Sequence, residues 1–115
     1  MRFVALAIFL FMLAPAFASD TDGNYHVGGG AGAVTCPEFS DVMGVARAGG
    51  IGSAQYVHRT EGYTMYVLGY QTGYNQQAAA TYNIFANISP DQALAWIDNY
   101  CQAHPLSTFS RGYAP

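Results

Sequence analysis

The sequence predicts an all-α fold, a small helical bundle of three to four helices closed by one disulfide. Three observations predict it. Apolar side chains recur at helical spacing in three segments, helix-capping residues precede two of those segments, and the chain has two cysteines that lie far apart. A chain of 115 residues buries only a modest core, so a covalent crosslink contributes a large share of its stability.

Residues 1–18 predict a cleavable signal peptide. Arg2 supplies the charged start, an apolar run extends from Phe3 to Leu13, and Ala16 and Ala18 form a small-x-small cleavage site. The apolar run is well short of the roughly 20 residues that span a bilayer as a helix. Export predicts a periplasmic or secreted location, which is an oxidising environment.

The two cysteines, Cys36 and Cys101, lie in the region that remains after signal cleavage. In an oxidising compartment such a pair normally forms a bridge. The sequence therefore predicts a Cys36–Cys101 disulfide.

Residues 19–34 are rich in glycine and show no apolar periodicity, which predicts a flexible N-terminal arm. A single helical domain is expected over residues 35–115. Thr35 and Glu38 form a capping-box pattern, which predicts a first helix from Cys36 to about Ala46. Four apolar residues share its expected buried face: Phe39, Val42, Met43 and Ala46.

A second helix is expected from Ala54 to about Asn75, because its tyrosines recur at steps of three, four and seven residues. A strand over residues 63–70 is the alternative, since that stretch is also rich in residues typical of strands. Gly69 and Gly73 lie one turn apart, and we expect them to form a shallow notch where another helix packs.

The third helix has the clearest start, because Ser89, Pro90 and Gln92 provide an N-cap, a first-turn proline and a capping-box partner. Leu94, Ile97 and Cys101 lie on its expected buried face, and Pro105 marks its end. A short final turn is expected around Leu106 and Phe109. Asp91 and Asp98 are interpreted as a partner of the helix dipole and a solvated surface acid.

The mature chain of 97 residues is acidic, with three arginines, seven carboxylates and no lysine, which gives a net charge of −4. Nucleic acids and anionic membrane surfaces are bound by clustered positive charge, which this chain lacks. The sequence therefore predicts no nucleic-acid partner and no membrane association after signal cleavage.

The sequence predicts no catalytic residues, no metal site and no cofactor, so the protein is not expected to be an enzyme. His26, His58 and His104 are scattered and match no nucleophile–base arrangement. Cys101 and His104 have a spacing seen in metal sites, but a cysteine held in a disulfide cannot ligate a metal.

Nine tyrosines raise the question of an aromatic binding surface. Most tyrosines on a helix face pack at the edge of a core. The alternative is that some of four tyrosines belong to an exposed partner surface: Tyr63, Tyr66, Tyr70 and Tyr74. The expected partner is a specific protein or an unfolded client, and the sequence leaves open whether the chain forms a homodimer.

The chain resembles the HdeA/HdeB-like group of small periplasmic helical proteins in three stretches. These are residues 35–39 (TCPEF), residues 69–75 (GYQTGYN), and residues 96–101 (WIDNYC) with the following residues 104–106 (HPL). The best-known members are acid-stress chaperones, so the resemblance implies an exported stress or chaperone-like function. The chain is also similar, in its Gly-Tyr and Tyr-Cys stretches, to periplasmic immunity proteins that neutralise cell-wall amidase toxins.

Two functions are therefore expected as alternatives, both without catalysis. In the first, acid protonates the seven carboxylates and charges the three histidines, and the resulting repulsion loosens the helices so that they bind unfolding clients. In the second, the protein binds one specific partner, such as an amidase effector, at neutral pH.

Overall fold

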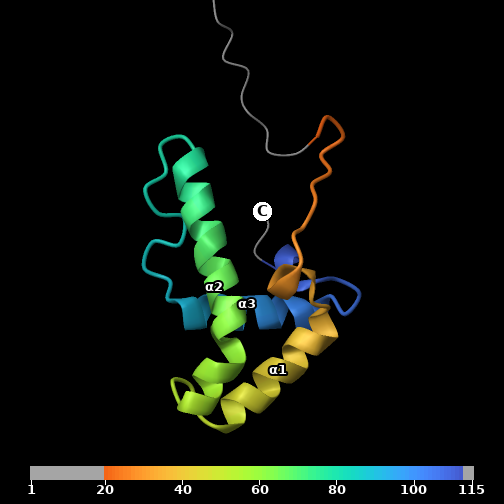
Figure 1. Ribbon diagram of the computed structural model, residues 1–115, viewed down its shortest axis with the longest axis vertical. Coiled ribbons are helices and arrows are strands. Elements are labelled where there is room, and N and C mark those ends of the chain that lie inside the picture. Colours follow the sequence, from red (N-terminus) through yellow and green to blue (C-terminus); the bar gives the residue numbers. More distant parts are fainter. Residues whose placement is uncertain (1–19, 113–115) are drawn as a thin grey trace, which may run out of the picture.

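Three α-helices and two short 3-10 helices make up the computed structural model, which describes residues 20–112 (Figure 1). The elements are η1 (Gly30–Ala33), α1 (Cys36–Ala48), α2 (Ala54–Gln77), α3 (Pro90–Ala103) and η2 (Phe109–Arg111). α1 and α2 diverge from the loop that joins them, and α3 crosses both (Figure 1). The predicted all-α fold is confirmed, with a disulfide that links α1 to α3. The predicted signal peptide lies outside the described residues.

Each α-helix begins at a hydroxyl-bearing N-cap. The Thr35 hydroxyl accepts a hydrogen bond from the backbone N–H of Glu38 at 3.4 Å, and the Ser53 hydroxyl accepts one from Tyr56 at 3.1 Å. At α3 the bonding is reciprocal, because Ser89 accepts from the Gln92 N–H while the Gln92 side chain accepts from the Ser89 N–H. Such caps typically contribute about 1 kcal/mol each to helix stability. The predicted start of α3 at Ser89 is confirmed.

α2 is one continuous helix through residues 63–70, which excludes the strand alternative. The predicted notch at Gly69 and Gly73 is wrong. Both glycines are exposed, and a Cβ built on either one would meet nothing within 4 Å. They therefore accommodate no neighbouring helix.

The core lies where the three helices and η2 meet. Phe39 of α1 is at its centre, with its ring centroid 4.7 Å from that of Phe109 and 4.9 Å from that of Tyr63. The buried face predicted for α1 is largely confirmed, with Val42 only half-buried. The buried apolar set is Cys36, Phe39, Met43, Ala46, Tyr56, Val67, Ala93, Leu94, Ile97, Cys101 and Phe109.

The segment just before α1 is part of the fold rather than of a flexible arm. Gly30–Ala33 form η1, and the carbonyl of Val34 accepts a hydrogen bond from the Phe109 N–H at 2.9 Å. The Cys36 N–H in turn donates to the Ser107 carbonyl at 3.0 Å. The last residues of the arm expected over residues 19–34 therefore have a defined place next to the C-terminal segment, and a flexible arm before them stays a prediction. Among residues 20–112, no helix has the length and hydropathy of a membrane span.

Gly32 allows η1 to approach α2 closely, and this gives a testable prediction. A Cβ at Gly32 would overlap the ring of Tyr66, whereas a Cβ at Gly28 would meet nothing within 4 Å. We expect Gly32→Ala to lower the free energy of unfolding by about 1 to 2 kcal/mol, because the Tyr66 ring must move out of its packed position. Urea unfolding of Gly32→Ala beside Gly28→Ala measures this, and equal midpoints for the two variants would contradict it.

Candidate functional site

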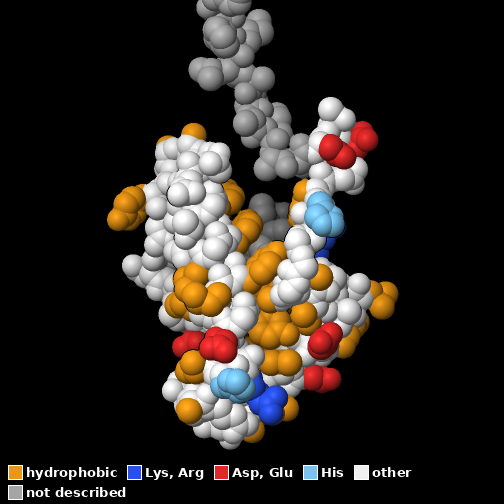
Figure 2. Space-filling model, viewed as in Figure 1, with side chains coloured by type: hydrophobic (Ala, Val, Ile, Leu, Met, Phe, Trp, Pro, Cys, Tyr) orange, Lys and Arg blue, Asp and Glu red, His pale blue; other side chains and the backbone are white. Residues whose placement is uncertain are grey.

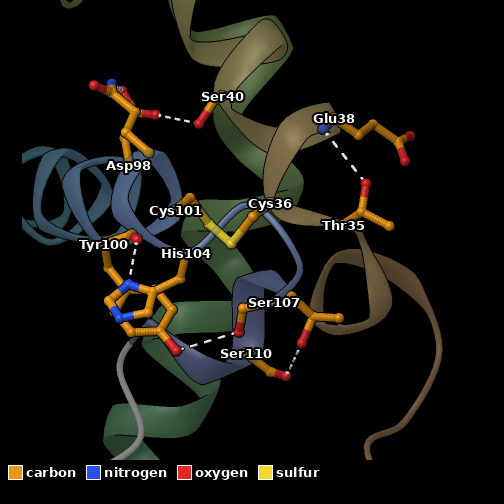
Figure 3. Close-up of a disulfide and its surroundings, with 12 residues drawn as sticks. Thr35, Cys36, Glu38, Ser40, Asp98, Tyr100, Cys101, His104, Ser107 and Ser110 are labelled. Carbon is orange, nitrogen blue, oxygen red and sulfur yellow. Dashed lines mark hydrogen bonds between the residues drawn. A yellow bond between two sulfur atoms is a disulfide. The ribbon is translucent and has the colours of Figure 1, made fainter.

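The disulfide between Cys36 and Cys101 is buried and ties the start of α1 to the end of α3 (Figure 3). The two cysteines are 65 residues apart in sequence. Beyond Cys101, the chain turns back through a hydrogen bond between the Tyr100 and Ser107 hydroxyl groups at 3.2 Å (Figure 3). The bridge therefore closes most of the helical domain into one covalent loop, as predicted.

A second link between α1 and α3 is a buried carboxylate, Asp98, which is 1% exposed. The Ser40 hydroxyl donates to its Oδ1 at 2.7 Å, and the guanidinium of Arg47 donates to its Oδ2 at 2.5 Å. The Gln102 amide, one turn further along α3, donates to the same Oδ2 at 3.2 Å. Asp98 is thus fully satisfied and bonded to two residues of α1.

The interpretation of Asp98 as a solvated surface acid is wrong. The sequence does contain a signal for its burial, because Asp98 follows Leu94 by four residues and precedes Cys101 by three. Residues at those spacings share one helix face, and both neighbours are buried. Asp91, by contrast, is exposed in the first turn of α3, where it suits the helix dipole.

The four tyrosines proposed as a partner surface divide into two pairs. Tyr63 and Tyr66 are half-buried and pack against Phe109, with centroid distances of 5.0 and 6.1 Å. Tyr70 and Tyr74 pack against each other at 5.9 Å, further along α2. Burial raises the pKa of Tyr63, with a smaller effect from the charge of Glu38. The first pair therefore completes the core.

Tyr74 is 36% exposed, whereas Tyr70 is half-buried, as Tyr63 and Tyr66 are. Burial raises the pKa of Tyr70 as well, with smaller contributions from Tyr74 and Tyr25. Apolar side chains gather in the angle between α1 and α2 on the face that Figure 2 shows. Of the four tyrosines, Tyr74 alone is among the exposed side chains, and a partner surface at these residues stays a prediction.

A groove that sequence reasoning missed lies between α3 and the segment that precedes it. It has a volume of about 360 Å³, and its lining is almost entirely apolar. We name it the Trp96 groove, and it is lined by Phe85, Ile88, Gln92, Ala93, Trp96 and Ile97. The side chain of Trp96 is 70% exposed and that of Ile88 is 54% exposed. Exposed tryptophan beside a preformed apolar groove is typical of protein-binding surfaces.

The described lining of the Trp96 groove is mostly apolar. Its one polar lining residue among those described is Gln92, which already bonds to the Ser89 N–H in the α3 cap. Within residues 20–112, no three His, Cys, Asp or Glu side chains gather as metal ligands would. His104 stacks on Tyr100 at 4.1 Å, and its Nδ1 lies 2.8 Å from the Tyr100 carbonyl, outside the groove. What the arrangement offers is apolar contact area.

Comparisons of the chain with protein-family models, with curated proteins and with solved structures find no significant match.

Proposed function

We propose that the protein is an exported, non-catalytic chaperone-like protein that captures apolar segments of unfolding proteins under acid stress, in the periplasm or outside the cell. The observation that carries the proposal is Asp98. It joins α1 to α3 beside the disulfide, so the same two helices are held by one ionic link and one covalent link.

Acid acts on ionic links and leaves a disulfide intact. The ionic link here is the Asp98 carboxylate, which accepts hydrogen bonds from Arg47, Ser40 and Gln102, and charge-assisted bonds of this kind are stronger than neutral ones. Between pH 7 and about pH 2 the formal net charge of residues 19–115 changes from −4 toward +6, since seven carboxylates lose their charge and three histidines gain one. Repulsion among the remaining positive charges then favours a looser domain.

The disulfide limits how far the chain expands. A domain whose packing is loosened while its ends stay joined resembles the compact acid states of other proteins, which expose apolar surface but keep their helices. The surfaces that become available include the aromatic cluster of Phe39, Tyr63 and Phe109, in addition to the already exposed Trp96 groove. Unfolding clients expose the same kind of apolar surface, which provides the driving force for capture.

Light scattering of a client that aggregates at about pH 2 to 3 tests the proposal. We expect the mature, oxidised protein to suppress aggregation in acid and to have little effect at neutral pH. Trp96→Ala should weaken suppression by about 1 to 2 kcal/mol of binding free energy, whereas Leu106→Ala should not, because Leu106 is fully exposed outside the groove. Full aggregation in the presence of several-fold excess protein would contradict the proposal.

The preformed Trp96 groove favours a second candidate function. A groove that is open without any acid change suits a module that binds one protein partner at neutral pH, such as an immunity protein for a cell-wall amidase effector. A pull-down from envelope extract at pH 7 discriminates the two. One partner that is retained by the wild type and by Leu106→Ala, but lost with Trp96→Ala, would favour this function over the acid-dependent one.

A further inference from the structure

A second groove, on the first half of α2, differs from the Trp96 groove in carrying charge. It has a volume of about 350 Å³ and lies between α2 and the first residues of α3. We name it the acidic groove, and it is lined by Gly52, Tyr56, Val57, Thr60, Glu61, Thr64, Met65, Pro90 and Asp91.

The apolar part of the acidic groove is open to solvent. Val57 and Met65 lie two turns apart on one face of α2, and their side chains are 50% and 63% exposed. Tyr56 and Thr60 are buried beneath them. Methionine is flexible and polarisable, so Met65 can adapt to an aliphatic side chain placed against it.

The charged side chains that line the acidic groove are all negative. Glu61 lies between Val57 and Met65 on the same face of α2, and Asp91 faces the groove from α3. Both side chains are exposed, and none of the described lining residues is cationic. Burial raises the pKa of Tyr56, and the neighbouring Asp91 carboxylate raises it further. Arg47, whose charge also reaches Tyr56, is paired with Asp98.

We propose that the acidic groove binds a partner segment in which an aliphatic side chain is flanked by lysine or arginine, the aliphatic group lying between Val57 and Met65 and the cations meeting Glu61 and Asp91. Charge complementarity selects this occupant. A second copy of the chain is disfavoured, because the mature protein has no lysine and a net charge of −4. The proposal concerns neutral pH, so it goes beyond acid-dependent client capture and does not depend on it.

The test uses the mature, oxidised protein at pH 7 and three short amidated peptides. The first has a leucine between two lysines, the second replaces the lysines by glutamates, and the third replaces the leucine by serine. We expect only the first to bind measurably by calorimetry, with affinity that falls as salt is added. Its amide chemical-shift perturbations should map to Val57, Glu61, Met65 and Asp91.

Variants assign the binding to the groove. Glu61→Gln should lower the affinity for the lysine peptide roughly twofold to fivefold, as expected for loss of an exposed charge pair. Met65→Ala should lower this affinity at least as much. Asp41→Asn is the matched control, because it removes an exposed carboxylate of α1 outside the groove and should leave the affinity unchanged. Far-ultraviolet circular dichroism checks that each variant is folded.

Three results would overturn the proposal. The first is a lysine peptide that binds no better than the glutamate or the serine peptide. The second is a set of shift perturbations that map to the Trp96 groove instead. The third is a dimer, detected by sedimentation, that the Met65→Ala substitution dissociates. In that case the acidic groove would be occupied by a second copy of the chain.

Discussion

Replacing Cys36 and Cys101 together by alanine is expected to lower the free energy of unfolding by about 4 kcal/mol. The bridge joins residues 65 apart, so its removal frees a long loop in the unfolded chain. Small domains typically have only about 5 to 15 kcal/mol of total stability, so the loss leaves a marginal fold. Urea unfolding of the mature chain, followed by circular dichroism, measures the effect.

The wild type itself provides the control for this prediction. Adding a reductant to wild-type protein should reproduce most of the loss while keeping both sulfur atoms in the core, and the same reductant should not affect the alanine variant. If reduction left the urea midpoint of the wild type unchanged, the bridge would not be the main restraint on the fold.

We expect Asp98→Ala to lower the free energy of unfolding by about 2 to 3 kcal/mol at neutral pH. The change leaves Ser40, Arg47 and Gln102 without their shared acceptor. The cost falls below the full value for a buried ion pair, because the Arg47 side chain is 36% exposed and can recover contact with water. Asp41→Ala removes an exposed carboxylate of α1 and should change stability by less than about 0.5 kcal/mol.

A second substitution separates the charge of Asp98 from its size. Asp98→Asn keeps the size of the side chain but removes its charge, so it should lower the free energy of unfolding at pH 7, because Arg47 loses its ionic partner. Urea midpoints of the wild type and of Asp98→Asn measure this effect. Equal midpoints would show that the charge of Asp98 does not stabilise the domain.

Local signals in the sequence were sufficient for the helices and the disulfide. The Ser89 capping box and the apolar periodicity of α3 act through short-range chemistry, and the two cysteines after residue 18 leave one possible pairing; each prediction was confirmed. The order of Gly30–Ala33 could not be predicted in this way. That segment has no apolar periodicity of its own, and the residues that follow it pair with the C-terminal segment, Val34 with Phe109 and Cys36 with Ser107.

The positions of the glycines were the least reliable guide to close packing. Gly69 and Gly73 have helical spacing and suggested close packing, yet both face open space. The close approach occurs at Gly32, inside a run of glycines that resembles a linker. The Trp96 groove was missed for a related reason, because part of its lining comes from the loop before α3, whose position depends on tertiary packing.

Near-ultraviolet circular dichroism of the mature, oxidised protein from pH 7 to about pH 2 tests most directly whether acid loosens the contact between α1 and α3. Its signal reports the fixed environments of the aromatic side chains, among them the cluster formed by Phe39, Tyr63 and Phe109. We expect this signal to fade over the pH range in which client aggregation is suppressed, while the far-ultraviolet signal of the helices persists. A near-ultraviolet spectrum that is unchanged at pH 2 would contradict the account.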